Sequence, residues 1–248
     1  IIKGTRTFKN SIGSLNELTK KEINFLNEEI LKIDLKNKNV KTTTKILSYD
    51  FLIIAMGAVL APEKIPGLLE NGLNLYDHSQ LTEIHNRIKK MKTGNIVISI
   101  MGMPYKCPPA PFEASLLIDS MLRDAGVRNS VQIHFYSPAP ITLPAAGPEI
   151  SQQILNLINS ESIVFHKSCK IKSVEKNKLI FQNGEANFDL LLAIPPHIAP
   201  KVIYDSELAK EDGFIPINRD CKTSFENVFA VGDVTTLTVV DTMTVPKA

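Results

Sequence analysis

The chain has 248 residues, of which 44% are hydrophobic and 22% charged, a size and composition typical of one large or two small globular domains. Its 28 basic and 26 acidic residues leave a formal net charge of +2, which is too small to indicate binding to nucleic acid. Three cysteines and five scattered histidines, without CxxC or HExxH spacing, argue against a disulfide scaffold or a metal cluster and favour a reduced, cytoplasmic setting.

The first predicted elements are a helix over residues 14–26 and then one copy of an internal repeat. Residues 28–57 and 169–194 each contain two short alternating strands around a Lys/Asn-rich turn, followed by a continuous apolar strand that an aromatic–Asp pair introduces. Alternation is typical of a half-exposed antiparallel ribbon. The continuous apolar runs at 49–55 and 188–193 predict strands buried on both faces of a parallel sheet.

Between the two copies the pattern predicts a complete α/β unit. The predicted elements are a helix at 79–90, a strand at 95–101, a Pro-rich loop at 102–111, a helix at 112–125, a strand at 131–136 and a helix at 149–159. Such an alternation forms right-handed crossovers in a doubly wound sheet. The first copy has no comparable unit before it, so we expect its domain to be incomplete.

The far end of the chain contributes a closing strand. Residues 212–218 lead into 223–234, where a buried strand ends in Gly232-Asp233. A carboxylate at the carboxyl edge of an α/β sheet can accept hydrogen bonds from sugar hydroxyls, and a glycine lets the backbone approach a phosphate closely. A surface turn is the alternative interpretation of this pair.

Together these segments resemble a known family. The chain resembles the FAD-dependent pyridine nucleotide-disulfide oxidoreductases, and within them the sulfide:quinone oxidoreductase and flavocytochrome c sulfide dehydrogenase branch. The segments that carry the resemblance are 49–57 (YDFLIIAMG), 107–113 (CPPAPFE), 223–233 with its Phe-Ala-Val-Gly-Asp end, 194–197 (IPPH) and 245–248 (VPKA).

The resemblance implies a three-layer α/β fold with two Rossmann-like FAD/NAD(P)-binding domains, the second inserted in the first. We expect residues 1–75 to form part of an FAD-binding domain, 76–195 the inserted domain and 196–248 the return to the first. The first domain is expected to lack its phosphate-binding start and its closing helix.

FAD is the cofactor that the resemblance implies. Ala55-Met56-Gly57 matches the family's Ala-Thr-Gly turn near the pyrophosphate and flavin, with Met56 in place of the usual Thr. Gly232-Asp233 matches the pair that holds the ribityl-phosphate region, and Ile30 lies in the strand whose backbone commonly meets adenine. Lys247 matches the lysine beneath the flavin C2 carbonyl, where an ammonium stabilises negative charge.

The inserted domain is predicted not to bind NAD. Its strand-to-helix turn should read GxGxxG so that backbone N–H groups can hold a pyrophosphate. At 101–109 the turn instead reads MGMPYKCPP, in which prolines remove N–H donors, and the strand ending at Tyr136 is followed by no acidic residue.

Cys107 is the candidate redox residue. It lies next to Lys106 and just before a predicted helix, two features that favour a reactive thiolate. The resemblance places it at the cysteine that forms a persulfide or flavin-linked intermediate, and Glu113 at a carboxylate that shuttles protons. The alternatives are an ordinary small side chain in a Pro-rich loop and a glutamate favoured by the helix dipole.

The remaining candidates are assigned structural roles. The family's partner thiol usually lies beyond the Pro-Lys element, so Cys169, in a predicted alternating strand, and Cys221, in a polar turn, are expected to be structural. His197 is expected to be a solvated loop residue, with proton handling as the alternative.

The predicted function is oxidation of sulfide or a related sulfur species through Cys107 and FAD to a quinone. The alternatives are an NAD(P)H:acceptor flavoprotein of the type II NADH dehydrogenase kind and an FAD-free, non-catalytic domain. The resemblance leaves open peripheral membrane attachment through a C-terminal segment and a homodimer.

Overall fold

The computed structural model describes residues 2–5, 8–15, 18, 21–209 and 213–237. By their contacts these residues form two compact units, the first comprising 1–10 and 60–197 and the second 11–59 and 198–248. The predicted domain boundaries at 75/76 and 195/196 stay a prediction. The chain passes between the units through β5 (Val59–Leu60) and β14 (His197–Ile198), two short strands that pair with each other.

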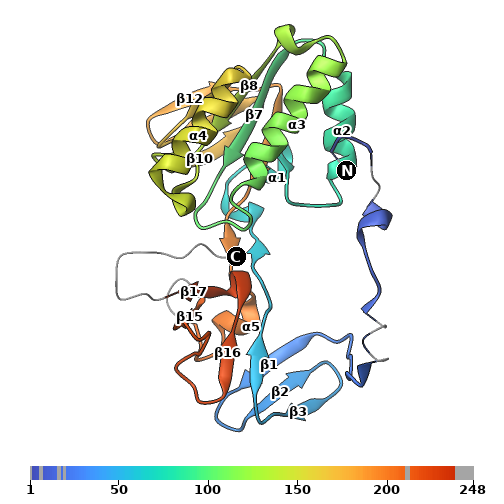
Figure 1. The fold of residues 1–248 in the computed structure, drawn as a ribbon, viewed down its shortest axis with the longest axis vertical. Helices are drawn as coiled ribbons and strands as arrows, with labels where there is room; N and C mark the ends of the chain where they lie inside the picture. The colour runs from blue at the N-terminus through green and yellow to red at the C-terminus, as the bar shows by residue number, and fades with distance from the viewer. Residues whose placement is uncertain (1, 6–7, 16–17, 19–20, 210–212, 238–248) are drawn as a thin grey trace. The chain divides into compact units, whose positions relative to one another are not determined.

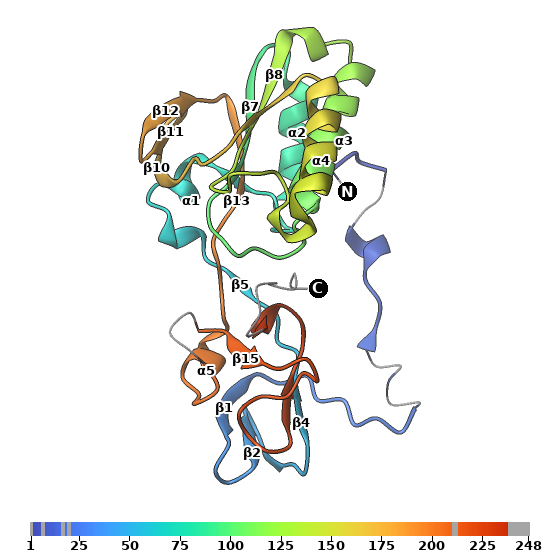
Figure 2. The same cartoon turned by 60° about the vertical axis from the view of Figure 1, so that its left-hand side comes forward.

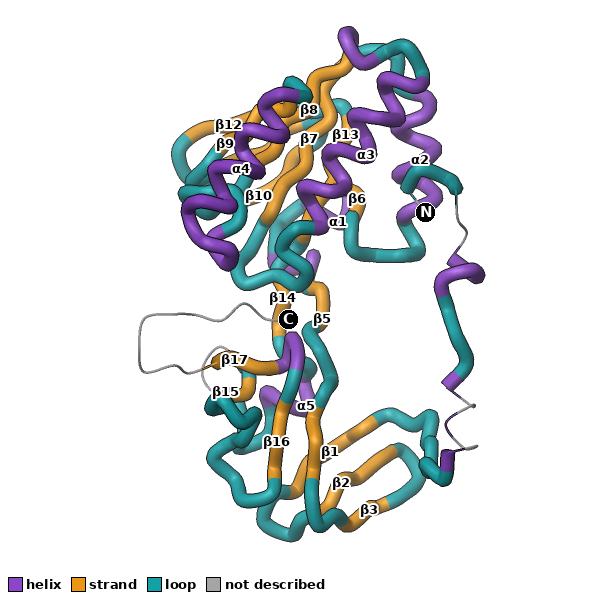
Figure 3. The backbone as a smooth tube through the Cα atoms, in the orientation of Figure 1, coloured by secondary structure: helices purple, strands orange, loops and turns teal. Residues whose placement is uncertain are grey.

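The first unit is built on a five-stranded parallel sheet, as predicted for the inserted α/β unit. Its order is β6-β13-β7-β8-β9, so β13 returns from far along the chain to lie between β6 and β7 (Figure 3). The strands are β6 (Leu73–Asn74), β7 (Gly94–Ile100), β8 (Val131–Tyr136), β9 (Ile163–His166) and β13 (Leu190–Ile194). The helices are α1 (Leu68–Asn71), α2 (Leu81–Lys90), α3 (Ala110–Asp124) and α4 (Gly147–Ser160).

Both faces of this sheet are covered, which explains why β7 and β13 are continuous apolar runs. Alternate residues such as Ile96 and Ile98 share a core with Ile118 of α3. The residues between them, such as Val97, pack with Leu179 from the antiparallel strands β10 (Ile171–Glu175), β11 (Lys178–Phe181) and β12 (Gly184–Asn187). Figure 2 shows α2, α3 and α4 on one side of the sheet and these three strands on the other.

The second unit contains the first copy of the repeat (Figure 1). Its antiparallel strands are β1 (Ile30–Asp34), β2 (Asn39–Thr42) and β3 (Ile46–Ser48). Its parallel pairs are β4 (Leu52–Ile54) with β16 (Val228–Ala230), and β15 (Ile215–Ile217) with β17 (Thr235–Leu237). The helix α5 (Lys201–Tyr204) contributes Ile203 to a core that includes Ile54, Ile215 and Val228.

The internal repeat is confirmed by strand register. The β1–β2 and β10–β11 pairs have the same irregularity, between Ile30 and Lys32 in one and between Ile171 and Ser173 in the other. Each ribbon also has a third strand, β3 or β12, that the sequence analysis did not predict. Both strands are short, and β12 contains Gly184 and Asn187, so neither has a strong strand pattern.

Two predictions about the second unit are wrong. The expected helix over 14–26 does not extend over described residues 22–26, where Ile23 and Leu26 are exposed and lack the packed surface that sustains a short helix. Residues 16, 17, 19 and 20 of the expected helix lie outside the described residues. The strand after the first ribbon is not buried on both faces: Phe51 is 68% exposed and Ile53 is 69% exposed. Phe51 and Ile53 are two residues apart and so share one face, which the described residues leave uncovered.

Among the described residues, no helix is both long enough and apolar enough to cross a membrane.

Candidate functional site

In the first unit, three neighbouring strands bring three side chains to one edge of the parallel sheet. The order β6-β13-β7 means that the segments leaving the carboxyl ends of these strands are neighbours. Tyr76 follows β6, His197 follows β13, and Cys107 lies in the loop after β7. Ligands of open α/β sheets bind at this edge.

Cys107 is exposed and has a left-handed backbone with φ +47°. Its carbonyl oxygen accepts two hydrogen bonds, from the N–H of Ala110 at 3.0 Å and from the hydroxyl of Tyr76 at 3.0 Å. Ala110 is the first residue of the 15-residue helix α3, so Cys107 lies three residues before the positive end of that helix. This placement agrees with the sequence analysis, although the left-handed backbone was not foreseen.

Two tyrosines that the sequence analysis missed lie at this cysteine. Burial raises the pKa of the Tyr76 phenol, and the charges of Tyr105, Cys107 and Glu113 raise it further. Burial, followed by Cys107, also raises the pKa of Tyr105, whose hydroxyl donates to the Pro108 carbonyl at 3.2 Å. Both tyrosines therefore stay protonated hydrogen-bond donors near neutral pH. Glu113 is exposed in the first turn of α3. Its charge, like that of Cys107, contributes to the raised pKa of Tyr76.

His197 was expected to be a solvated loop residue, and this is wrong. Only 7% of the residue is exposed, and the Tyr76 ring lies edge-on to the imidazole with centroids 5.7 Å apart. His197 Nδ1 is 3.0 Å from the Pro195 carbonyl oxygen. Because a carbonyl only accepts, Nδ1 is the nitrogen that carries hydrogen. His197 is also the first residue of β14, which pairs with β5.

The turn after β7 has little room for a dinucleotide phosphate. A Cβ placed on Gly102 would lie 3.0 Å from both Cα and Cβ of Pro196. The close approach that this glycine permits is therefore used by the protein's own Pro196. Among the next seven residues, Pro104, Pro108 and Pro109 have no N–H to offer a phosphate.

In the second unit, the predicted FAD-binding turns meet at one sheet edge. Ile54 pairs with Ala230 in the parallel β4–β16 pair, so Ala55-Met56-Gly57 and Gly232-Asp233 leave the sheet side by side. Gly57 and Gly232 have φ of +67° and +75°, and a Cβ on either would meet no atom within 4 Å. Left-handed glycines facing open space let a ligand approach the backbone closely.

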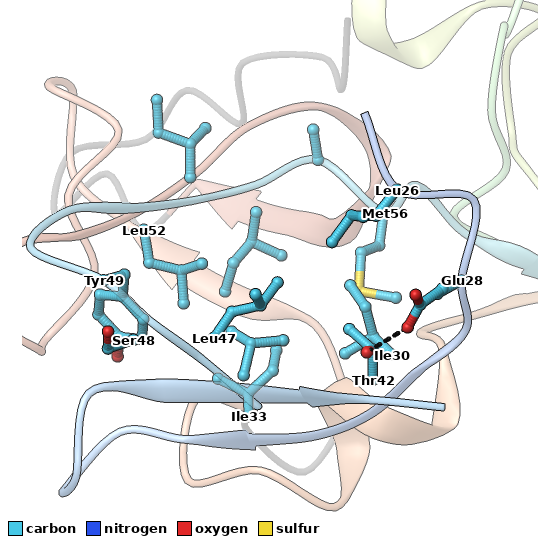
Figure 4. Close-up of a pocket in the computed structure, with 14 residues that line it drawn as sticks. Leu26, Glu28, Ile30, Ile33, Thr42, Leu47, Ser48, Tyr49, Leu52 and Met56 are labelled. Carbon is cyan, nitrogen blue, oxygen red and sulfur yellow. Dashed lines mark hydrogen bonds between the residues drawn. The ribbon is translucent and has the colours of Figure 1, made fainter. Parts of the chain in front are cut away.

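An apolar cavity of about 510 Å³ lies beside the first of these turns. Figure 4 shows Ile30, Met56 and Leu26 together at one end, near the hydrogen bond from Thr42 to Glu28. That bond and a second from Thr44 lower the pKa of Glu28, so the carboxylate is charged at neutral pH. The complete lining is Leu26, Glu28, Ile30, Ile33, Val40, Thr42, Leu47, Ser48, Tyr49, Leu52, Ile53, Ile54, Ala55 and Met56.

FAD fits this part of the second unit. The cavity volume is within the range of small-ligand sites, and its lining is mostly apolar. The Tyr49 hydroxyl is buried beside it without a hydrogen-bond partner among the described residues. Backbone N–H groups at the two open glycine turns supply polar contacts for phosphate. Of the residues expected to contact FAD, Ile30, Ala55 and Met56 line this cavity, whereas Gly57, Gly232 and Asp233 lie at the two turns. Lys247 lies outside the described residues.

The other two cysteines lie in turns or loops. Cys169 precedes β10 and is not within a strand as predicted; its thiol donates to the Lys167 carbonyl at 3.3 Å, and burial raises its pKa. Cys221 is half-buried in a turn with φ +61°.

Tyr76 had no sequence signal strong enough to identify it. The strand that positions it, β6, has only two residues, too few for an alternating pattern. The apolar-rich stretch Leu73–Leu75 after Gly72 indicates a short strand. It does not indicate which strand of the sheet lies beside it.

Comparison with known proteins extends these observations. A family model described as pyridine nucleotide-disulphide oxidoreductase matches residues 120–248. The mitochondrial sulfide:quinone oxidoreductase of Schizosaccharomyces pombe is 26% identical over 215 residues, covering 80% of this chain and 47% of that protein. The type II NADH:quinone oxidoreductase of Staphylococcus aureus is 22% identical over 247 residues, covering 93% and 61%.

The fold is also similar to that of a solved structure. The sulfide:quinone oxidoreductase of Aquifex aeolicus has a TM-score of 0.85 at 23% identity, over 99% of this chain and 60% of that one. The chain spans about half the length of the curated sulfide:quinone oxidoreductases that it matches.

Proposed function

The chain belongs to the pyridine nucleotide-disulphide oxidoreductase family, and we propose that the protein is an FAD-dependent oxidoreductase. In this proposal sulfide or a related sulfur species is oxidised through Cys107, and a quinone receives the electrons. The relatives named sulfide:quinone oxidoreductase support the choice of substrates. One observation of this chain carries the sulfur chemistry: Cys107 is exposed at the carboxyl edge of a parallel sheet and three residues before the first residue of α3.

The proposed step at Cys107 is formation of a sulfur–sulfur bond. The thiolate and a hydrosulfide ion combine into a persulfide, RS⁻ + HS⁻ → RSS⁻ + H⁺ + 2e⁻. The positive end of α3 stabilises the anionic sulfur. Glu113, exposed in the first turn of that helix, is the proposed acceptor of the released proton.

FAD, when bound, supplies the two-electron acceptor that this bond formation requires, and a quinone takes the electrons onward. In the second unit, Gly57, Gly232 and Asp233 are proposed to contact its phosphate and sugar groups. Ile30, Ala55 and Met56 are proposed to contact its apolar surface along the cavity. Lys247 is proposed to stabilise negative charge on the cofactor.

NAD(P)H oxidation is the rival activity, and its support is the likeness to type II NADH:quinone oxidoreductase. The turn after β7 argues against NAD(P)H binding. Pro196 lies against Gly102, and three prolines in the turn have no N–H group that could bind a phosphate. An FAD-free, non-catalytic role is the second rival.

The test is made on FAD-loaded protein under anaerobic conditions. Sulfide is expected to bleach the flavin absorbance near 450 nm, whereas NADH is not. Cys107→Ser should abolish the sulfide-driven bleaching. Cys221→Ser is the matched control, because Cys221 has a similar left-handed backbone in the other unit, and it should retain full activity.

Three outcomes would contradict the proposal. Bleaching by NADH and not by sulfide would favour the rival oxidoreductase. Failure of the protein to take up added FAD would favour the non-catalytic role. Undiminished sulfide oxidation in Cys107→Ser would remove the cysteine from the mechanism.

A further inference from the structure

We propose that Tyr76 is a positioning residue that holds Cys107 in its left-handed conformation and thereby sets the reactivity of the thiol. This inference rests on the proposed role of Cys107. It adds a second residue, which holds the backbone of that cysteine through a hydrogen bond.

The backbone of Cys107 is the first part of the argument. A residue with a Cβ rarely adopts a left-handed conformation unless neighbouring interactions maintain it. The Cys107 carbonyl accepts the Ala110 N–H from within the same turn and the Tyr76 hydroxyl from 31 residues away. Tyr76 therefore supplies a long-range contact that ties this peptide group to the sheet.

The position of Tyr76 is itself well determined. The Asn74 side-chain oxygen accepts the Tyr76 backbone N–H at 2.9 Å, and the Asn74 N–H donates to Gln80 at 2.8 Å. Asn74 pairs with Ala193 in the sheet, so Tyr76 leaves a fixed point at the end of β6. A donor anchored in this way can hold a loop that carries a functional group.

Ring and hydroxyl of Tyr76 have separable contacts. The ring packs edge-on to His197, whereas the hydroxyl donates to Cys107. Burial raises the pKa of the phenol above its ordinary value, which favours the protonated hydroxyl that donates to Cys107. Tyr76→Phe therefore removes the contact to Cys107 and retains the aromatic ring.

The experiment measures alkylation of Cys107 by iodoacetamide in the purified protein, read at the Cys107 peptide by mass spectrometry from about pH 6 to 10. Loss of one neutral hydrogen bond should reduce the population of the left-handed conformer, and with it the alkylation rate, by up to about fivefold in Tyr76→Phe. Tyr105→Phe is the matched control, because it removes a hydroxyl that binds the Pro108 carbonyl in the same loop. Its alkylation profile should stay within about twofold of the wild type.

The fold of each variant is checked by circular dichroism. Should Tyr76→Phe not fold, Tyr76→Met, which is adaptable in packing and has no donor, replaces it. A folded Tyr76 variant whose alkylation profile matches the wild type at every pH would overturn the proposal, as would equal slowing in Tyr105→Phe.

Alkylation requires neither FAD nor sulfide, so this result is independent of the proposed function. If Cys107→Ser leaves sulfide oxidation intact, the proposed function fails whatever the alkylation rates are. If Tyr76→Phe leaves alkylation unchanged, the positioning role fails while sulfide oxidation stands. In FAD-loaded protein, Tyr76→Phe should slow sulfide-driven bleaching by a similar factor and leave FAD affinity unchanged.

Discussion

Ile54 and Ala230 lie directly opposite each other in the parallel pair β4–β16, and the N–H of Val231 donates to the Ile54 carbonyl at 2.9 Å. Because the two strands run in the same direction, the turns that follow them leave the sheet together. One turn contains Gly57 and the other Gly232, both left-handed and both facing open space. Two segments separated by more than 170 residues thereby lie together at the sheet edge where we propose that FAD binds.

Gly232→Ala should weaken FAD binding on the order of tenfold, because a methyl group would occupy the space that a phosphate needs. Flavin titration followed by fluorescence quenching measures this. Gly126→Ala is the matched control: Gly126 has φ +69° and equally open surroundings in the other unit, so its backbone strain is comparable. Each variant should lose about 1–2 kcal/mol of stability. Equal FAD affinities in the two variants would contradict the assignment of Gly232.

Arg128→Met should destabilise the first unit by about 3–5 kcal/mol, measured by urea unfolding. Arg128 is buried and donates to the carboxylate of buried Asp119 and to three backbone carbonyls, those of Val131, Glu161 and Ser162. Its loss would leave an Asp119 carboxylate with fewer partners in a buried setting.

The control for this network is Arg123→Met. Arg123 also binds Asp119, at 2.6 Å, but half of its side chain is exposed. Its removal should cost about 1 kcal/mol or less, since water replaces an exposed partner. Similar costs for the two variants would show that burial does not govern this network.

Stability of the first unit should fall as the pH drops below about 6.5. Burial lowers the pKa of His134 and of His166, and the charge of His134 lowers that of His166 further. The folded state therefore binds fewer protons than the unfolded state below the unfolded pKa, so acid favours unfolding until the folded pKa values are passed. The hydrogen bond of 3.1 Å between His134 Nδ1 and His166 Nε2 is lost when both rings are charged.

The measurement is the urea midpoint at about pH 7.5 and 5.5. His166→Phe keeps a ring that can stack on Tyr136, where the centroids are 4.2 Å apart, and removes one titrating group. It should flatten the pH dependence. An unchanged slope in this variant would refute the role of the histidine pair.

Gly67→Ala should cost about 3 kcal/mol in the first unit. Gly67 has φ +76°, and a Cβ there would lie 2.0 Å from the Val174 carbonyl oxygen, a backbone atom that cannot move without displacing β10. Left-handed strain and the required shift add together. Gly126→Ala again serves as the control for strain alone, and a cost no larger than that of the control would contradict the close contact.

Much of the inserted unit could be predicted because its signals are local. The apolar run at 95–101 and the helical periodicity at 112–125 correspond closely to β7 and α3, since a strand buried on both faces and a helix with one buried face have different periods. The repeat was visible for the same reason. The Gly232-Asp233 turn was recognised because a glycine and an acid after an apolar strand form a short contiguous pattern.

Other features depended on what surrounds each segment. Ile23 and Leu26 belong to a helical pattern but are exposed in the part of the chain that the structure describes. Phe51 and Ile53 belong to an apolar run of which one face is exposed there. An apolar pattern indicates which face of a segment can be buried. It does not indicate whether another segment covers that face.

The sequence by itself determined the class of fold, the repeat, and the chemistry available at Cys107 and at the two glycine turns, because residue type and local spacing encode them. Only the tertiary structure decided that Tyr76, His197 and Cys107 meet at one sheet edge. That meeting depends on β13 entering the sheet between β6 and β7, an order that differs from the order along the chain. Strand order follows from how whole faces of the sheet are covered, and no local pattern records it.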